Sequence, residues 1–502
     1  MGKFFQKYFY REPNIYIVGM LYCAVASAFI WWIGFARPAY LFWLYNIPRL
    51  DILYLNSGGV KALLRIIISF IVLGGSYWFA YQWASKVRGK AAWAVIIGGA
   101  ILQAGVLLLM APFNSTDIFD NISHGRILGF YHTNPFMWVT ADFPTDPFTR
   151  FTGWPEAPSA YGPLWEQAAA LTARLAGNGI PQNIIAFKLL PGLFWAGCVA
   201  LVALIFRKRK PGSALRGALF LAWNPVALFE IFGNGHNDPS FLLWILLAVW
   251  AMLERRYTIA ILSLVVGTLF KFMPAVLIPA AGLIALQELP GWKQRAAFLF
   301  RSALISVVLI VAAYAPFWEG IKTLSIDRRA HLFATTLGSS IYQTLLPALG
   351  KEQSAALVSP LAAVLTLGFA VWMGFHILRS RAPDRFALSA MIIFAFYLMV
   401  TVLFFWPWYT IWLIALVPLV RDKQLRTLAI VFSFVAINKD LLNFLNINSS
   451  QTVLPEPWME IWLTLRVMLV PWLYAVYSLL SHRRGTSLMP EVTLYRAKPR
   501  ED

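Results

Sequence analysis

Charged residues are scarce in this chain. Asp, Glu, Lys and Arg together make up 13% of the 502 residues, whereas a soluble globular domain carries about 25%. Hydrophobic residues reach 59%, and 22 residues are Trp. The composition excludes a mostly soluble protein and leaves little room for a separate soluble domain. It predicts an all-α polytopic membrane protein.

Acidic residues are the scarcer of the two charge types. Asp and Glu number 23 against 42 Lys and Arg, which gives a net charge of +19. Such a balance often indicates nucleic-acid binding. Here, however, the basic residues form short runs between apolar segments, at 207–210, 379–385, 421–426 and 482–484. This is the positive-inside pattern of membrane proteins, so the charge reports topology and no nucleic-acid partner is expected.

The sequence has only two cysteines and lacks the common sequence motifs of metal, nucleotide and serine-hydrolase sites. Cys23 and Cys198 both lie in apolar runs, where a small buried side chain is favoured over a disulfide or a metal ligand. The sequence has no zinc-ligand spacing, no phosphate-cradling glycine loop and no G-x-S-x-G elbow. A nucleotide-dependent enzyme would need a soluble domain, so any group donor is expected to reach the protein within the membrane.

Apolar runs dominate the chain. Thirteen of them approach the ~20 residues that cross a bilayer, and the run at 257–288 is long enough for two short spans divided by Pro274 and Pro279. We therefore expect about 12–14 spans, with both termini and the basic runs on the cytoplasmic side. The prediction is one integral membrane domain over 1–502. It comprises three spans in 1–113, a large outer catalytic loop with short interfacial helices at 114–181, the remaining spans in 182–480 and a cytoplasmic tail at 481–502.

A polar island at 114–136 follows the third apolar run. Asp117 and Asp120 lie three residues apart with no Lys or Arg within five positions, so a helix places both on one face. With His124 and Arg126 nearby, such an acid is suited to remove a proton from an incoming hydroxyl. The alternative is a helix start, with Ser115 or Thr116 as cap and the acids offsetting the helix dipole. Acids at a membrane edge favour the functional interpretation.

A second polar group lies at 224–239, in the sequence WNPVALFEIFGNGHNDP that begins at Trp223. It contains Glu230, His236, Asn237 and Asp238, which could hydrogen-bond a polyhydroxylated substrate. The alternative is an ordinary solvated turn, because Gly, Asn and Asp favour turns for backbone reasons alone.

Two groups of cations lie outside the basic runs. Lys271 is embedded in an apolar run just before the helix-breaking Pro274. This position predicts an anion site, with phosphate as the natural anion, against the alternative of a lysine that reaches up to the interface. Arg328 and Arg329, next to Asp327 and His331, lie in an outer loop. They could bind phosphate or anchor the loop to lipid headgroups.

An aromatic segment, FWPWYTIW at 405–412, closes the series. On composition alone it is typical of the aromatic belt at a membrane surface. Stacking of sugar faces on Trp408 and Tyr409 is the functional alternative.

The order of these motifs resembles that of a known superfamily. The polar island, YGPLW at 161–165, the 224–239 segment, KFMP at 271–274 and PWY at 407–409 follow one another as in the GT-C membrane glycosyltransferases. The chain resembles in particular the bacterial polyprenol-phosphate-mannose-dependent α-mannosyltransferases, over about 110–412. NPF at 134–136 is similar to the family's NPY. In the family's D-x-Y-x-Y pattern, however, Phe119 and Asn121 replace the tyrosines, so neither the donor sugar nor the acceptor is assigned.

The resemblance implies an inverting transferase that needs no cofactor. Asp117 would be the catalytic base, and Lys271 with Arg328 and Arg329 would bind the donor phosphate. The substrate-binding residues would be Asp120, His124, Tyr161, Glu230, His236, Asn237, Asp238, Trp408 and Tyr409. Some relatives use a divalent metal, which Asp117, Asp120 and Asp238 could hold, but a metal is not the favoured interpretation.

The expected partners are a polyprenyl-phosphate-linked sugar, most simply mannose, a glycan or glycolipid acceptor, and membrane lipids. The expected location is a bacterial inner membrane, with the active site on its outer face. Two alternatives stay open at this point. One is a flippase or transporter of lipid-linked sugars, which would place acids in mid-span. The other is a GT-C enzyme that uses another lipid-phosphate sugar, such as glucose or arabinose.

Overall fold

The computed structural model describes residues 13–44, 59–112, 114–324, 332–380, 382–441 and 455–484. Within these ranges the chain is built from helices and loops, and extended pairing is limited to two isolated bridges, Tyr40 with Met110 and Ala334 with Phe404. The all-α prediction is therefore confirmed.

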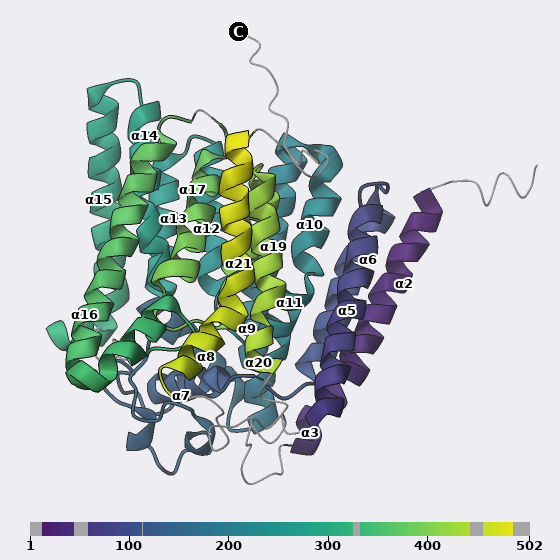
Figure 1. The fold of residues 1–502 in the computed structure, drawn as a ribbon, viewed down its shortest axis with the longest axis horizontal. Coiled ribbons are helices and arrows are strands. Elements are labelled where there is room, and N and C mark those ends of the chain that lie inside the picture. Colours follow the sequence, from purple (N-terminus) through teal and green to yellow (C-terminus); the bar gives the residue numbers. More distant parts are fainter. Residues whose placement is uncertain are drawn as a thin grey trace, which may run out of the picture.

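The first part of the chain forms three long helices that stand together at one side of the bundle (Figure 1). They are α2 (Pro13–Trp31), continued by the π-helix η1 (Trp32–Ala36), α5 (Gly59–Trp83) and α6 (Lys90–Leu108), with the short α3 (Leu41–Leu44) between the first two. Trp31, Phe35, Phe70 and Phe229 pack in edge-to-face, tilted and stacked pairs at centroid distances of 5.1 to 6.2 Å. Such aromatic contacts fix this helix group against the rest of the bundle.

The segment at 114–181 is ordered and packed. It contains α7 (Asp117–Gly129), the 3-10 turns η2 (Thr140–Asp142) and η3 (Thr149–Phe151), and α8 (Pro163–Ala176). Gly125 lets α7 and α8 approach closely, because a Cβ there would lie 2.7 Å from the carbonyl oxygen of Ala169. Asn134 of the NPF sequence donates hydrogen bonds to the Phe317 carbonyl at 2.7 Å and to Glu319 at 3.0 Å. The loop is thereby fastened to the main bundle.

The central helices follow in short pieces. They are α9 (Ile180–Arg209), η4 (Pro211–Ser213), α10 (Ala214–Ala222), α11 (Pro225–Leu228), η5 (Phe229–Gly233), α12 (Pro239–Leu253), α13 (Tyr257–Phe270), η6 (Met273–Leu277) and α14 (Ile278–Glu288). The predicted division of the 257–288 run is confirmed, because α13 ends at Phe270 and the chain turns through Lys271 before η6. Proline cannot continue the helical hydrogen bonds at Pro274.

The remaining helices complete the bundle. They are α15 (Trp292–Tyr314), η7 (Ala315–Phe317), η8 (Ile321–Leu324), α16 (Leu337–Ile377), α17 (Arg385–Phe396), η10 (Tyr397–Thr401), η11 (Pro407–Thr410), α18 (Ile411–Leu416), η12 (Val417–Leu419), α19 (Lys423–Ala436), α20 (Asn438–Leu441) and α21 (Trp458–Arg484). The long α16 is interrupted by a kink at Gly350, whose φ of 75° is not helical.

Seven of the described helices are long and apolar enough to cross a membrane, or eight if the bent pair 211–222 and 225–233 forms one span. Five other apolar helices have 10–17 residues. The sequence predicts 12–14 spans because every apolar run counts toward the total, with the 257–288 run counted as two. In the structure, several runs are broken by prolines and polar residues into helices shorter than a bilayer requires.

The two ends of the bundle differ in chemistry. The N-terminal end of α2 and the C-terminal end of α21 lie at one end, and α7 and α8 lie at the other (Figure 1). We call the first the basic end and the second the site end. Ion pairs join helices at the basic end, between Arg209 and Glu254 at 3.1 Å and between Arg385 and Glu288 at 2.6 Å.

Candidate functional site

The site begins where α6 gives way to α7. Asp117 is the first residue of α7, and its backbone N–H donates to the hydroxyl of Ser115 at 3.1 Å. Asn121, one turn further along, donates to the Asp117 carbonyl at 2.8 Å and accepts from the Trp165 indole at 2.8 Å. Of the two predicted caps, Thr116 occupies the N-cap position, but its side chain makes no capping hydrogen bond.

The carboxylate of Asp117 is half-buried. Within the described residues, no hydrogen bond or ion pair engages it. The charge nevertheless acts on its surroundings, because burial and then Asp117, Asp238 and Asp120 raise the pKa of Tyr161 well above its ordinary value. An unengaged, partly desolvated carboxylate at a helix start is suited to accept a proton.

Asp120 lies deeper than Asp117. Its two carboxylate oxygens accept the backbone N–H groups of Trp154, at 3.1 Å, and Gly153, at 3.4 Å. Burial, followed by the neighbouring charge of Asp117, raises the pKa of Asp120 to about 8. In this structure Asp120 therefore fixes the 153–154 part of the 114–181 segment over α7, and its predicted contact with a substrate stays a prediction.

His124 and Arg126 also face the loop. His124 Nε2 lies 3.3 Å from the Ala157 carbonyl oxygen. Arg126 is buried and forms a 2.7 Å ion pair with Asp146, which also accepts the Tyr131 hydroxyl at 2.9 Å. These contacts hold the shape of the 114–181 segment. For His124, the predicted role in substrate binding is not tested by them.

Lys271 and Asp238 form the centre of the site. Lys271 Nζ lies 2.9 Å from Asp238 Oδ1, and the Trp412 indole donates to the same oxygen at 2.6 Å. Asp238 is fully buried, whereas the Lys271 side chain is 17% exposed. The other carboxylate oxygen, Asp238 Oδ2, is buried and has no hydrogen-bond partner in the described part of the chain. A buried acceptor without a hydrogen-bond donor destabilises the folded protein, and a bound ligand that donates a hydrogen bond would relieve this cost in free energy.

Aromatic rings surround the lysine. Its Nζ lies 5.2 Å from the centre of the Tyr409 ring, 5.6 Å from that of Tyr161 and 5.7 Å from that of Trp412. Rings at this distance stabilise a cation and keep it partly dehydrated. An arriving anion would therefore meet a lysine that is held in place and poorly screened by water.

The YGP sequence brings α8 to the lysine. The N–H of Gly162 donates to the Phe270 carbonyl at 2.9 Å, directly before Lys271. A Cβ at Gly162 would lie 2.1 Å from the Leu269 carbonyl oxygen, so only glycine permits this approach. Tyr161 is consequently placed between α7 and the break after α13, where the charges of both Asp117 and Asp238 raise its pKa.

Glu230 and His236 form a buried layer behind this centre. Glu230, in the π-helix η5, accepts from Asn114 at 3.4 Å and from Asn234 at 3.3 Å, and its Oε2 lies 3.3 Å from His236 Nε2. The His236 ring stacks on Trp408, with centroids 3.7 Å apart. The layer links the island, the GHNDP turn and the PWY segment. It supports the site from behind, and direct contact of Glu230 or His236 with substrate stays a prediction.

Asn237 and Tyr409 complete the predicted set. Asn237 is buried in the turn before α12, where its carbonyl accepts the N–H of Ser240 at 2.9 Å. The Tyr409 ring lies 4.9 Å from that of Trp412. The segments at 161–163, 236–238, 271 and 407–412 are thus brought together in space.

Two predicted phosphate ligands cannot be placed. Arg328 and Arg329 lie outside the described residues, together with Asp327 and His331. Among the described residues, no group of three or more His, Cys, Asp or Glu side chains is arranged to hold a metal ion. Asp117, Asp120 and Asp238 therefore do not form such a group here.

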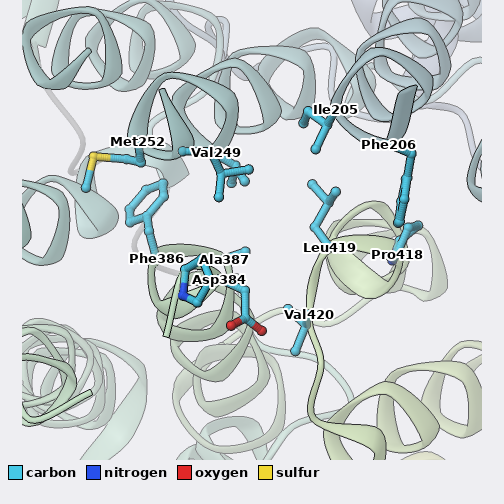
Figure 2. Close-up of a pocket in the computed structure, with 12 residues that line it drawn as sticks. Ile205, Phe206, Val249, Met252, Asp384, Phe386, Ala387, Pro418, Leu419 and Val420 are labelled. Atoms are coloured by element: carbon cyan, nitrogen blue, oxygen red, sulfur yellow. The ribbon is translucent and has the colours of Figure 1, made fainter. Parts of the chain in front are cut away.

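A separate cavity at the basic end is too small for a sugar. Figure 2 shows it between the ends of α9 and α12 and the segment around Pro418, with Asp384 and Phe386 on its other side. Its volume is about 20 Å³, which is room for about one water molecule. Its lining is mostly apolar, and Asp384 accepts the N–H of Arg421 at 2.9 Å.

Sequence reasoning missed three residues that shape the site. In the sequence, Trp412 stands out only as part of an aromatic segment, and Asn121 only as a departure from a tyrosine. Lys188 lies fully buried in α9 and donates to the carbonyls of Leu107, at 3.3 Å, and Met110. A lone lysine in an apolar run is the same signal that identified Lys271, so Lys188 could have been found.

Comparison with known proteins adds an independent finding. The family model described as the alpha-(1->6)-mannopyranosyltransferase N-terminal domain matches residues 17–287, which is more than half of the chain. None of the curated proteins matches the chain. The matched region contains Asp117, Tyr161, Glu230, Asp238 and Lys271.

Proposed function

The chain belongs to the alpha-(1->6)-mannopyranosyltransferase family, and we propose that it transfers mannose from a polyprenyl-phosphate donor to a hydroxyl of a glycan or glycolipid. Membership makes the protein an α-mannosyltransferase and argues against a flippase, which would form no glycosidic bond. The lipid-linked donor is proposed because the chain is a membrane protein with at least seven candidate spans and contains no recognisable nucleotide site.

Asp117 is the proposed base. The observation that carries this assignment is its half-buried carboxylate, which nothing in the described part of the chain engages, across Tyr161 from the Lys271–Asp238 pair. Asp117 takes the proton of the acceptor hydroxyl. The oxygen then bonds to the anomeric carbon from the face opposite the phosphate. One base suffices for inversion, unlike the carboxylate pair of a retaining enzyme.

Lys271 is the proposed receiver of the leaving group. As the bond between the anomeric carbon and the phosphate oxygen breaks, its electron pair stays on the polyprenyl phosphate. A lysine within a ring of aromatics stabilises that charge better than one in water. Arg328 and Arg329 are proposed to assist, and no cofactor is required by these steps.

Sugar hydroxyls are the proposed ligands of the remaining polar atoms. Asp238 Oδ2, which lacks a partner in the described chain, is placed to accept a hydroxyl proton beside Lys271. Tyr409, Trp408 and Asn237 would lie along the sugar. We place the site on the outer face of a bacterial inner membrane, with both termini in the cytoplasm, because the basic end carries the cation-rich runs.

A donor assay tests the proposal. Purified protein in lipid nanodiscs is incubated with radiolabelled polyprenyl-phosphate mannose and a mannan-type acceptor, with the glucose and arabinose donors in parallel. We expect label to pass to the acceptor from the mannose donor only, in the presence of excess chelator. Transfer from glucose or arabinose alone, or transport of intact donor without transfer, would overturn the donor assignment.

A further inference from the structure

A second charged site lies far from the catalytic residues, at the basic end. A groove of about 620 Å³ opens between the α12–α13 turn and the start of α15. Four of its lining residues are exposed cations, Arg255, Arg256, Lys293 and Arg301. We call these four residues the basic groove. No acidic residue lines it.

The cations of the basic groove have no acidic partners. Within the described ranges, none of the four forms an ion pair. The two acids that directly precede lining residues in the sequence have cation partners outside the groove, Glu254 in Lys208 and Arg209 and Glu288 in Arg385. The positive-inside rule explains cations at this end, but it does not explain their convergence on one hollow without counter-charge.

The backbone also presents the cations in a defined way. Arg255 has a φ of 55°, in the left-handed region that non-glycine residues seldom occupy. This turn between α12 and α13 places Arg255 and Arg256 side by side at the rim, and Arg256 lies 5.4 Å from the centre of the Trp250 ring. Strained residues are often found where a loop holds a ligand.

An apolar surface continues from the groove. Leu299, Phe300 and Leu304 of α15 are 51%, 68% and 52% exposed, and α15 stands at the outer edge of the bundle (Figure 1). We propose that the basic groove binds the phosphate headgroup of an anionic glycerophospholipid, whose acyl chains lie along this face of α15. A phospholipid fits this surface because its charged headgroup can pair with the cations while its acyl chains pack on the exposed apolar side chains of α15.

Lipid titration with a matched control tests the proposal. Native mass spectrometry of the detergent-solubilised protein would follow binding of dioleoyl-phosphatidylglycerol and dioleoyl-phosphatidylcholine. The groove variant is Arg256→Gln/Lys293→Gln/Arg301→Gln. The control, Lys86→Gln/Arg88→Gln/Lys90→Gln, removes the same charge from exposed cations of the α5–α6 turn at the same end. The thermal midpoint in lipid-free detergent reports whether each variant folds.

We expect phosphatidylglycerol to bind the wild-type protein and the control with the same affinity, and to bind the groove variant more weakly by roughly fivefold for each cation removed. Phosphatidylcholine should not distinguish the three proteins. Equal losses in groove variant and control, or no loss in the groove variant, would overturn the proposal. Displacement of the lipid by millimolar inorganic phosphate would assign the groove to a soluble phosphate ester and overturn the lipid assignment.

Discussion

Lys271 and Asp238 face each other at 2.9 Å across the break that follows α13. The lysine is thus partly neutralised before any anion arrives, and the same carboxylate accepts the Trp412 indole at 2.6 Å. A phosphate that binds Lys271 must share it with Asp238 or separate the two. This arrangement gives the lysine a structural role beside its proposed catalytic one, and mutation can distinguish the two.

Replacing Lys271 by Met removes the partner of a buried carboxylate. We expect a loss of stability of roughly 3–5 kcal/mol, as for other broken buried ion pairs, together with a loss of transfer. Thermal melting in detergent and the radiolabel assay measure the two effects.

The double variant Lys271→Met/Asp238→Asn separates the effect on stability from the effect on sugar transfer. The neutral amide no longer needs the lysine, so the melting temperature should return most of the way to the wild-type value while activity stays low. Recovery of activity along with stability would show that Lys271 has no part in stabilising the leaving phosphate.

Asp117→Asn should lower the turnover number by about 10²–10⁴, the usual contribution of a general base. At pH 6, where Asp120 is protonated, it should leave the melting temperature nearly unchanged, because no described residue engages the carboxylate. Glu156→Gln is the matched control, since Glu156 is an exposed acid of the same loop. If the two variants retain similar turnover, Asp117 is not the base.

Asp120 predicts a pH dependence of stability. Its pKa is about 8 in the folded protein against an ordinary value of 3.8, so between these values the folded state binds more protons than the unfolded state. Stability then falls as pH rises through this window. We expect the melting temperature of the wild-type protein to decrease from pH 6 to pH 8.5 by more than that of Asp120→Asn.

The charge of Asp117 contributes to the raised pKa of Asp120. Asp117→Asn should therefore shift the wild-type pH transition to lower pH. If the melting temperature depends on pH in the same way for the wild-type protein, Asp117→Asn and Asp120→Asn, this interpretation is contradicted.

Trp408→Ala should destabilise the protein by roughly 3–5 kcal/mol, the usual cost of removing a buried aromatic ring. Its indole covers the His236 ring at 3.7 Å and stacks on Trp406 at 5.0 Å. Trp408→Phe keeps a ring in place and should lose less. Chemical denaturation in detergent gives the comparison, and equal effects of Ala and Phe would mean that stacking contributes little.

The helical class could be predicted from the sequence, and so could the charged positions around Lys271, since their signals are local. Lys271 is a charge in an apolar run before a proline, and Asp117 is an acid that follows an apolar run. The structural tasks of Asp120 and Glu230 could not be predicted. They depend on contacts with Trp154 and Asn114, which only folding brings within reach.

The number of spans was harder to predict for a related reason. Apolar composition does not reveal where a helix stops, and the π-helical turns and proline breaks around Glu230 and Lys271 shorten several runs. The same interruptions place polar side chains such as Glu230 and Lys271 within otherwise apolar sequence. The positions that make the spans hard to count are therefore also positions that contribute residues to the candidate site.

Lys188 has a mechanical consequence. By gripping the carbonyls at the end of α6, it ties α9 to the point from which the chain runs on to Asp117, only seven residues after Met110. A buried lysine of another helix therefore holds the point from which the chain leads to the proposed base.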